Sequence, residues 1–169
     1  MVRIAMVLLA LLLFAFPANA ALRVNESAPL FSLPLLAGGQ FDLAVALGKV
    51  RNGASGGVIL TFFATWCGPC RKELPLLNTL AGELGGQGIS VVAVDLKEDT
   101  SIVRRFIAGL RADRLTVVID RDGKTAEQYQ VRFLPTTFCI GADGKIKDLL
   151  FGEARSADEF RQCAEKILK

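Results

Sequence analysis

The sequence predicts an α/β fold with a central mixed β-sheet flanked by helices, and two patterns support this prediction. Apolar runs rich in β-forming residues at 58–64 and 89–96 are each followed by a segment with helical periodicity, which is typical of buried strands in strand–helix units. Later, apolar segments at 135–140 and 146–151 flank the turn sequence GADGK, which predicts a β-hairpin. Parallel and antiparallel strands are therefore expected in one sheet.

The first twenty residues are expected to be a secretory signal peptide. Arg3 is followed by an unbroken apolar run at 4–16 and then by Ala18-Asn19-Ala20, which is typical of a cleavage site. The run is shorter than the roughly 20 residues of a transmembrane helix, so retention as an anchor is the less favoured alternative. The remaining residues, 21–169, have the length of a single domain.

The first half of this domain is predicted as follows. Residues 28–43 hold two short apolar stretches joined by two glycines, which predicts an added N-terminal β-hairpin. The Gly-rich stretch 48–57 is expected to be a surface loop. The strand 58–64 then leads into a helix over 69–84, and Pro75 is expected to kink that helix because it lacks an N–H donor.

The second half continues the alternation of strands and helices. After the second buried strand, an amphipathic helix capped at Asp99 or Thr100 is predicted, followed by a strand at 115–120. A short helix should end near Gln130. The chain closes, after the hairpin, with an amphipathic helix capped at Ser156.

Composition excludes several classes of function. The sequence contains no histidine, which excludes Ser-His-Asp and Cys-His hydrolases, Cys₂His₂ zinc sites and histidine-ligated haem. A net charge of +3 gives no strong field for nucleic acid, so no nucleic-acid partner is expected. Four cysteines in an exported chain are free to form disulfides. Of the functions that cysteines commonly serve, the one that remains is chemistry that thiols perform without histidine.

The segment Trp66-Cys67-Gly68-Pro69-Cys70 lies between the first buried strand and the start of the following helix. Unpaired N–H groups and the helix dipole at such a position stabilise a thiolate, the nucleophile of disulfide exchange. Cys67, at the helix start, is expected to be the more exposed and attacking sulfur. Cys70, one turn further in, is expected to resolve the mixed disulfide.

Other uses of the cysteines are less favoured. A zinc clip would need a second cysteine pair or histidines, and a disulfide built only for stability would usually close a longer loop. Cys139 lies in a predicted strand and Cys163 on the apolar face of the last helix. Both are expected to be buried free cysteines, with a disulfide between them as the alternative. No metal and no cofactor other than the Cys67–Cys70 pair are expected.

The segments FFATWCGPCRKELP, FLPTTF and GADGKI resemble the TlpA/ResA-like branch of the thioredoxin superfamily, whose members are exported, membrane-facing thiol–disulfide oxidoreductases. The resemblance extends over nearly the whole mature chain. It implies a thioredoxin fold, with Cys67 and Cys70 as the catalytic pair. It also implies that Pro135 is a cis-proline that lies against the disulfide and offers backbone groups to a substrate chain.

The resemblance also indicates supporting residues. Glu73 matches an acidic residue that this branch uses near the active site, where a carboxylate could accept a proton from Cys70 or raise the pKa of its thiol. A solvated glutamate in the first helical turn is the alternative. Thioredoxin's buried Asp corresponds to Thr61, so the acid–base role of that Asp cannot be transferred. Trp66, which follows Thr65, is expected either to contact a docked peptide or to pack against the domain.

The function implied by the resemblance is the reduction of disulfides in protein substrates, such as apocytochrome c during cytochrome c maturation. The protein is expected in the periplasm or at the outer face of the cytoplasmic membrane, as a monomer. Gly68-Pro69 between the cysteines is the thioredoxin pairing and indicates a reductant. A reductant outside the cytoplasm needs an electron source, and the family uses a membrane protein that relays electrons from cytosolic thioredoxin.

Two alternative functions fit the sequence less well. A thiol peroxidase of the peroxiredoxin class has the pattern P-x-x-x-T-x-x-C, and counted back from Cys67 its Pro and Thr positions hold Leu60 and Ala64. A copper- or metal-handling protein of the same fold would present C-x-x-x-C and a distant histidine. This sequence has a shorter spacing and no histidine.

Overall fold

The computed structural model describes residues 21–48 and 56–169. The predicted signal peptide and most of the predicted Gly-rich loop therefore lie outside the described residues. Within the described part of the chain, no helix is long and apolar enough to cross a membrane.

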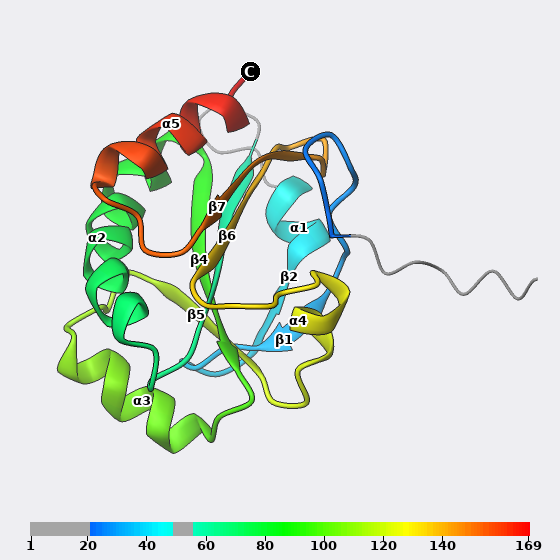
Figure 1. Ribbon diagram of the computed structural model, residues 1–169. Coiled ribbons are helices and arrows are strands. Elements are labelled where there is room, and N and C mark those ends of the chain that lie inside the picture. The colour runs from blue at the N-terminus through cyan, green and yellow to red at the C-terminus, as the bar shows by residue number, and fades with distance from the viewer. Residues whose placement is uncertain (1–20, 49–55) are drawn as a thin grey trace, which may run out of the picture.

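A five-stranded mixed sheet forms the centre of the molecule, with strands in the order β5-β4-β3-β6-β7 (Figure 1). The parallel strands are β3 (Gly57–Phe63), β4 (Ile89–Leu96) and β5 (Thr116–Asp120). The antiparallel hairpin strands are β6 (Thr136–Ile140), which pairs with β3, and β7 (Ile146–Phe151). Every residue of β3 is buried, as its continuous apolar sequence predicts.

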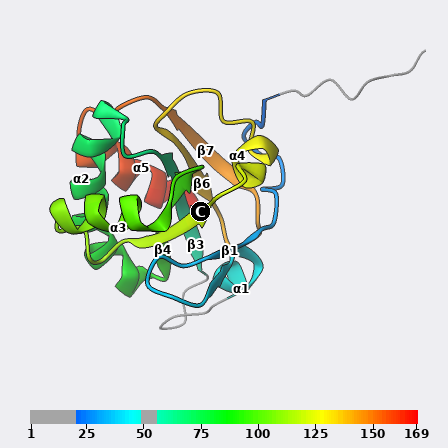
Figure 2. The ribbon, with the colours of Figure 1, turned by 90° about the horizontal axis from the view of Figure 1, so that it is seen from below.

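Helices cover both faces of this sheet (Figure 2). One layer contains α2 (Gly68–Leu84), α3 (Thr100–Gly109) and α5 (Ala157–Ile167), whose apolar side chains share a core cluster with Ile59 and Phe63 of β3. The opposite layer contains α1 (Leu43–Gly48) and α4 (Lys124–Gln128), which pack with Phe62 and Phe138. A short 3₁₀ turn, η1 (Gly85–Gln87), follows α2. Because β3 alternates between the two clusters, the central strand connects both halves of the core.

The N-terminal hairpin is a separate two-stranded sheet of β1 (Ser32–Pro34) and β2 (Gln40–Asp42). Its turn uses Gly38 and Gly39 with φ of 101° and 86°, a backbone region that glycine adopts at little cost. The Leu36 N–H donates to the Val117 carbonyl of β5 at 2.9 Å. The hairpin thus covers part of an edge strand that would otherwise expose unpaired backbone groups.

The predicted elements are present, and their boundaries shift by a few residues at most. The strand at 89–96 and the Ser156 cap of the last helix are as predicted. The α2 helix continues through Pro75 to Leu84 as one helix. The six-residue helix α1 was not predicted, because its few apolar residues are too short a run to show helical periodicity.

Cys139 and Cys163 form a disulfide, which corrects the prediction that both are free. Cys139 lies in β6 and Cys163 in α5, both with no exposed surface. The two Cα atoms are 5.7 Å apart, within the range that a disulfide spans. Sequence patterns placed each residue in the right element but did not show that α5 packs directly over β6.

Candidate redox site

The cysteine pair occupies the junction between β3 and α2. After β3, the Cys67 N–H donates to the Ala64 carbonyl at 3.1 Å, which turns the chain toward the helix. Cys67 is the N-cap of α2, and its sulfur accepts a hydrogen bond from the Cys70 N–H at 3.2 Å. Pro69 lies in the first turn, where its missing N–H leaves no donor unpaired. This backbone geometry directs an N–H group and the positive end of the helix dipole toward Cys67.

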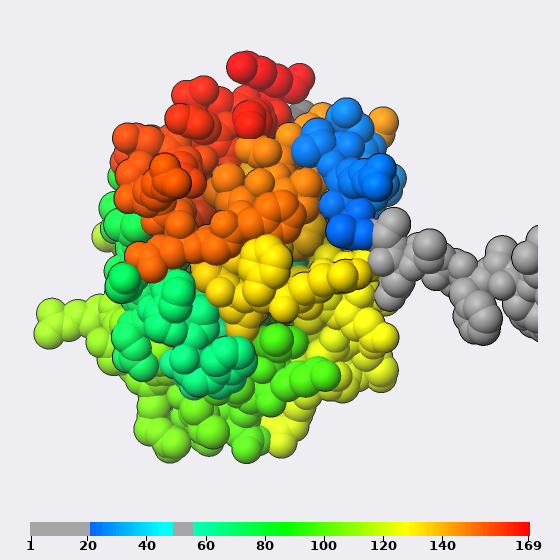
Figure 3. All heavy atoms as spheres, viewed as in Figure 1, coloured from blue at the N-terminus to red at the C-terminus, as the bar shows by residue number. Residues whose placement is uncertain are grey.

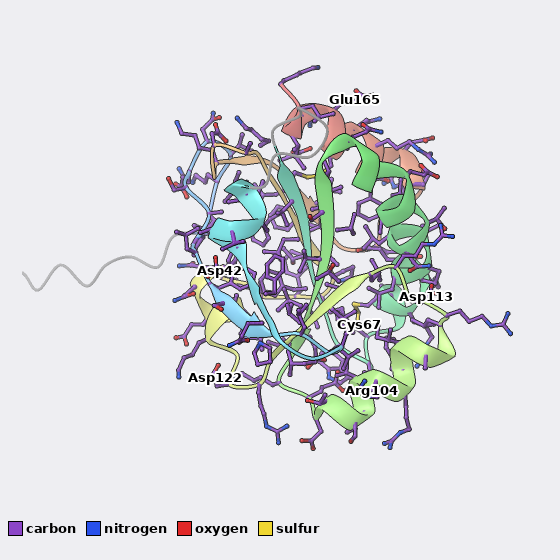
Figure 4. The ribbon with its side chains drawn as sticks, turned by 180° about the vertical axis from the view of Figure 1, so that it is seen from behind. Asp42, Cys67, Arg104, Asp113, Asp122 and Glu165 are labelled. Atoms are coloured by element: carbon purple, nitrogen blue, oxygen red, sulfur yellow. A yellow bond between two sulfur atoms is a disulfide. The ribbon has the colours of Figure 1, made fainter. Side chains whose placement is uncertain are left out.

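Cys67 and Cys70 are joined by a disulfide in the described structure. Cys67 is 5% exposed and Cys70 is 1% exposed, so Cys67 is the more accessible residue of the two. Figure 4 shows Cys67 at the same end of the molecule as Arg104 of α3 and far from Glu165 near the end of α5. This is the end where the parallel strands finish, the edge at which ligands bind in open α/β sheets.

A groove of about 420 Å³ opens beside Cys67. Trp66 and Phe133, which are 72% and 51% exposed, belong to its walls. The full lining is Trp66, Cys67, Gly68, Pro69, Leu96, Val131, Arg132, Phe133 and Leu134. In Figure 3 the teal start of α2 and the yellow segment that precedes β6 meet around a hollow on one face. The exposure of Trp66 contradicts the alternative in which it packs into the domain.

The peptide bond between Leu134 and Pro135 is cis, as the family resemblance implies. Pro135 is buried at the start of β6, and its carbonyl accepts a hydrogen bond from the Gly152 N–H at 2.9 Å. Leu134 lines the groove together with Cys67. The cis-proline segment therefore forms the wall of the groove that faces the cysteine pair.

Glu73 is buried in the layer beneath the pair, with 2% of its surface exposed. Its carboxylate accepts hydrogen bonds from the Thr61 hydroxyl at 3.3 Å and from the Ala154 N–H at 3.2 Å. The Thr137 hydroxyl donates in turn to Thr61 at 2.9 Å. Burial raises the pKa of Glu73 to about 7, although the two hydrogen bonds to the carboxylate oppose the rise. The alternative of a solvated glutamate is wrong.

A second acidic group, which sequence reasoning missed, adjoins the segment before Cys67. Both carboxylate oxygens of Glu98 bind Thr65, one at its N–H and one at its hydroxyl, each at 2.6 Å. The Glu98 N–H donates to Asp95 at 3.1 Å, and Asp95 is completely buried in β4. The aspartate inside the apolar run 89–96 was a signal that could have identified Asp95, whereas no local pattern marks Glu98.

Away from the cysteine pair, a larger cavity of about 760 Å³ lies between α3, β5 and the β1–β2 turn. It contains none of the residues that the sequence predicts for the site. Across residues 21–48 and 56–169, no three Cys, Asp or Glu side chains are grouped closely enough to hold a metal ion.

Comparison with known sequences gives a consistent result. Residues 24–149 match the AhpC/TSA family. The chain is 33% identical over 146 residues to the thiol-disulfide oxidoreductase ResA of Bacillus cereus strain ZK / E33L, covering 86% of this chain and 79% of that protein. It is 32% identical over 137 residues to ResA of Bacillus subtilis strain 168, covering 81% and 72%.

Solved structures confirm the thioredoxin-like fold. A putative thiol:disulfide interchange protein DsbE from Chlorobium tepidum superimposes with a TM-score of 0.77 at 31% identity, over 88% of this chain and all of that one. StoA from Bacillus subtilis superimposes with a TM-score of 0.66 at 21% identity, over 81% of this chain and 97% of that one. At the lower identity, the second likeness concerns the fold alone.

Proposed function

Since the chain belongs to the AhpC/TSA family of the thioredoxin superfamily and is a thiol–disulfide oxidoreductase, we propose that it reduces disulfide bonds in exported proteins. The observation that best supports this proposal is the Cys67–Cys70 disulfide at the N-terminus of α2, beside an open apolar groove. A disulfide at a helix start is easily reopened, because the helix N-terminus stabilises the thiolate that is released. The groove beside it can hold an extended peptide.

In the proposed reaction, the reduced pair begins as two thiols. The Cys67 thiolate attacks one sulfur of the substrate disulfide, and the other substrate sulfur leaves as a thiolate and takes a proton. The Cys70 thiolate then attacks the Cys67 sulfur of the mixed disulfide and releases the second substrate sulfur. The substrate gains two electrons and two protons, and the Cys67–Cys70 disulfide forms.

Three residues near the cysteine pair are proposed to assist this reaction. Glu73 accepts the proton of Cys70, because its carboxyl has a pKa near the working pH and lies one helical turn away. Trp66 provides an exposed apolar surface for the substrate chain. Pro135 fixes the facing wall of the groove, where its segment can offer backbone groups to the substrate.

The direction of electron flow follows from the residues between the cysteines. Gly68-Pro69 is the pairing of thioredoxin, whose potential of about −270 mV makes it a reductant, whereas the oxidant DsbA has about −120 mV. A reductant outside the cytoplasm must be re-reduced, and we infer that a membrane protein relays electrons to Cys67–Cys70. Apocytochrome c, whose thiols must be reduced before haem attachment, is the proposed substrate. The N-terminal sequence supports export, and the protein is proposed to act as a monomer.

Equilibration of the mature domain, residues 21–169, with glutathione buffers tests the direction. Alkylation of Cys67 and Cys70 followed by mass spectrometry gives the fraction reduced at each ratio. A potential near that of thioredoxin is expected, and a value above about −150 mV would contradict the assignment as a reductant. Replacement of both cysteines by serine should abolish reduction of a protein disulfide.

The substrate can be identified in the cell that produces the protein. In a Cys70→Ser variant the resolving thiol is absent, so the mixed disulfide with Cys67 should accumulate. Apocytochrome c or another exported protein is the expected partner in that complex. A Cys67→Ser variant, which lacks the attacking sulfur, is the matched control and should capture none.

A further inference from the structure

Asp95 is a fully buried carboxyl group that the proposed reaction does not use. It lies opposite Phe63 in the β3–β4 register, at the end of the sheet where the cysteine pair is placed. One of its oxygens accepts the Glu98 N–H at 3.1 Å. No N–H or O–H group of the described residues donates to the other oxygen, Oδ1. A buried carboxylate oxygen without a donor is costly, and its presence requires an explanation.

A proton on Asp95 explains the unpaired oxygen. The Asp95 side chain interacts with the Glu98 side chain, so a protonated Asp95 has an O–H group that it can donate to the Glu98 carboxyl group. The pKa of Asp95 is raised to about 7, first by burial and then by the neighbouring Glu98 and Asp120 side chains, whereas the hydrogen bond from the Glu98 N–H opposes the rise.

The charged groups around Asp95 favour this protonated form. Asp120 approaches from β5, where its carboxylate accepts the N–H groups of Thr125 and Ala126 at 3.2 and 2.8 Å. Glu98 approaches from the segment after β4, and the β3 neighbour Phe63 is apolar. The side chains that act on Asp95 are thus acidic, and only the Glu98 N–H stabilises its charged form.

Glu98 connects this proton to the redox site. Both of its oxygens bind Thr65, at the backbone N–H and at the hydroxyl, each at 2.6 Å. Two hydrogen bonds of this length from one carboxyl group fix both the main chain and the side chain of Thr65. Thr65 precedes Trp66 and Cys67 in the chain, directly before α2 begins. The position of Cys67 therefore depends on how firmly Glu98 is held.

We propose that Asp95 holds a proton that it shares with Glu98, and that this pair positions Thr65, and through it Cys67, for thiol–disulfide exchange. The inference rests on the proposed function, since it takes Cys67 as the attacking sulfur. Asp95 and Glu98 are positioning residues, because neither touches the reacting sulfurs. When Asp95 loses its proton, two carboxylates repel each other, Glu98 holds Thr65 less firmly, and a further negative charge opposes the Cys67 thiolate.

The Asp95→Asn variant tests the proposal because it imitates the protonated carboxyl at every pH. Its amide oxygen accepts the Glu98 N–H, and its NH₂ group donates to Glu98. The measurement is the rate at which iodoacetamide alkylates Cys67 in the reduced domain between pH 5.5 and pH 8. The ratio of the variant rate to the wild-type rate should be about 1 at the acidic end and should rise to about threefold at the alkaline end.

This ratio separates the proposal from other effects. Glu73 titrates in the same range but is present in both proteins, so its contribution cancels. A role of Asp95 in stability alone would change the ratio by the same factor at every pH, and a constant ratio overturns the proposal. Asp99→Asn replaces an exposed neighbour of Glu98 and is the control, with an expected ratio of about 1 throughout. If Cys67 of the wild-type domain does not react at any pH, both the inference and the proposed function fail.

A measurement on the wild-type protein keeps the proposal testable if Asp95→Asn does not fold. The side-chain carboxyl ¹³C shifts of Asp95 and Glu98, followed by NMR, report which group carries the proton. Titration of Asp95 in the neutral range, with a matching response at Glu98, is the expected result. Asp95 ionised from pH 5.5 upward would overturn the proposal.

Discussion

The Thr61 hydroxyl of β3 donates to the Glu73 carboxylate of α2 across 3.3 Å. Thr61 occupies the strand position at which thioredoxin has its buried aspartate, so in this protein the buried carboxyl group comes from the helix instead. The Thr137 hydroxyl donates to the Thr61 hydroxyl at 2.9 Å, and the Ala154 N–H donates to the Glu73 carboxylate at 3.2 Å. A carboxyl group with a pKa of about 7 thus lies one turn from Cys70, where it can exchange a proton at neutral pH.

Replacement of Glu73 by Gln is expected to slow the step in which Cys70 resolves the mixed disulfide. The amide keeps the volume and can accept the Ala154 N–H, but it cannot take the thiol proton, so a loss of about 100-fold near neutral pH is expected. Stopped-flow fluorescence of Trp66, the one tryptophan in the sequence, reports this step. Glu83→Gln, at the exposed end of the same helix, is the control. Equal rates in the two variants would contradict the role of Glu73.

The same carboxyl group should make the folded protein less stable as the pH rises. Glu73 has a pKa of about 7 in the folded protein, against the usual 4.5 of a glutamate, so the folded state keeps its proton to a higher pH than the unfolded chain does. Its contribution to the free energy of unfolding therefore decreases as the pH rises from the lower of these two pKa values to the higher, and it is constant above the higher one. Urea unfolding with intact disulfides should give a lower free energy of unfolding at pH 8 than at pH 5. Glu73 should account for about 2 to 3 kcal/mol of this difference. Glu73→Gln should remove that share, and an unchanged pH dependence in this variant would contradict the prediction.

The Cys139–Cys163 disulfide is expected to stabilise the fold without taking part in exchange. Both sulfurs have no exposed surface, so a mild reductant should reduce Cys67–Cys70 only and alkylation should label two cysteines. The double variant Cys139→Ala, Cys163→Ala removes a cross-link between residues 24 positions apart and should lower the free energy of unfolding by about 3 kcal/mol. The redox potential of the remaining pair should not change. Four labelled cysteines after mild reduction would show that the second bridge exchanges.

The sequence was sufficient for those parts of the site that depend on local patterns. Cys67 and Cys70 could be assigned because an apolar strand runs directly into a helix at that point. The contacts between segments that are distant in the sequence could not be assigned, because no local sequence pattern indicates them. The Cys139–Cys163 bond and the contact of Ala154 with Glu73 depend on how α5 and the segment before it cross the sheet.

Glu98 illustrates the same limit on the other side of the cysteine pair. Its side chain follows β4 in a polar segment and has no feature that distinguishes it from a solvated surface residue. Only the parallel pairing of β3 with β4 brings it to Thr65. Asp95 was visible as a charge in an apolar strand, but its importance follows from the contact with Glu98.

The protein is not expected to consume hydrogen peroxide catalytically. A peroxiredoxin uses Pro and Thr at the positions held here by Leu60 and Ala64, and both of these are buried apolar side chains that offer peroxide no hydrogen bond. The reduced domain should therefore react with peroxide no faster than an ordinary thiol. Peroxide consumption with dithiothreitol as the electron donor measures this. Turnover that disappears in Cys67→Ser would support the peroxidase alternative.

Trp66 is expected to contribute to the binding of protein substrates. It is 72% exposed at the mouth of the groove beside Cys67, and Phe133 of the same groove is 51% exposed, so a substrate chain in the groove would meet apolar surface from both. Aromatic side chains at such positions often dominate binding, and their truncation costs more than about 1 kcal/mol. Trp66→Ala should therefore raise the KM for a disulfide-containing peptide about 5- to 10-fold and leave kcat within about a factor of two.

The control for this prediction is Val45→Ala. Val45 is 57% exposed on α1, in the helix layer on the other side of the sheet from α2, so its truncation removes apolar surface without touching the groove. A substrate that lies along the groove would be affected by Trp66→Ala alone. Equal KM values for the two variants would mean that the peptide reaches Cys67 without contacting Trp66, and binding would then have to depend on Phe133 and Leu134 on the facing wall.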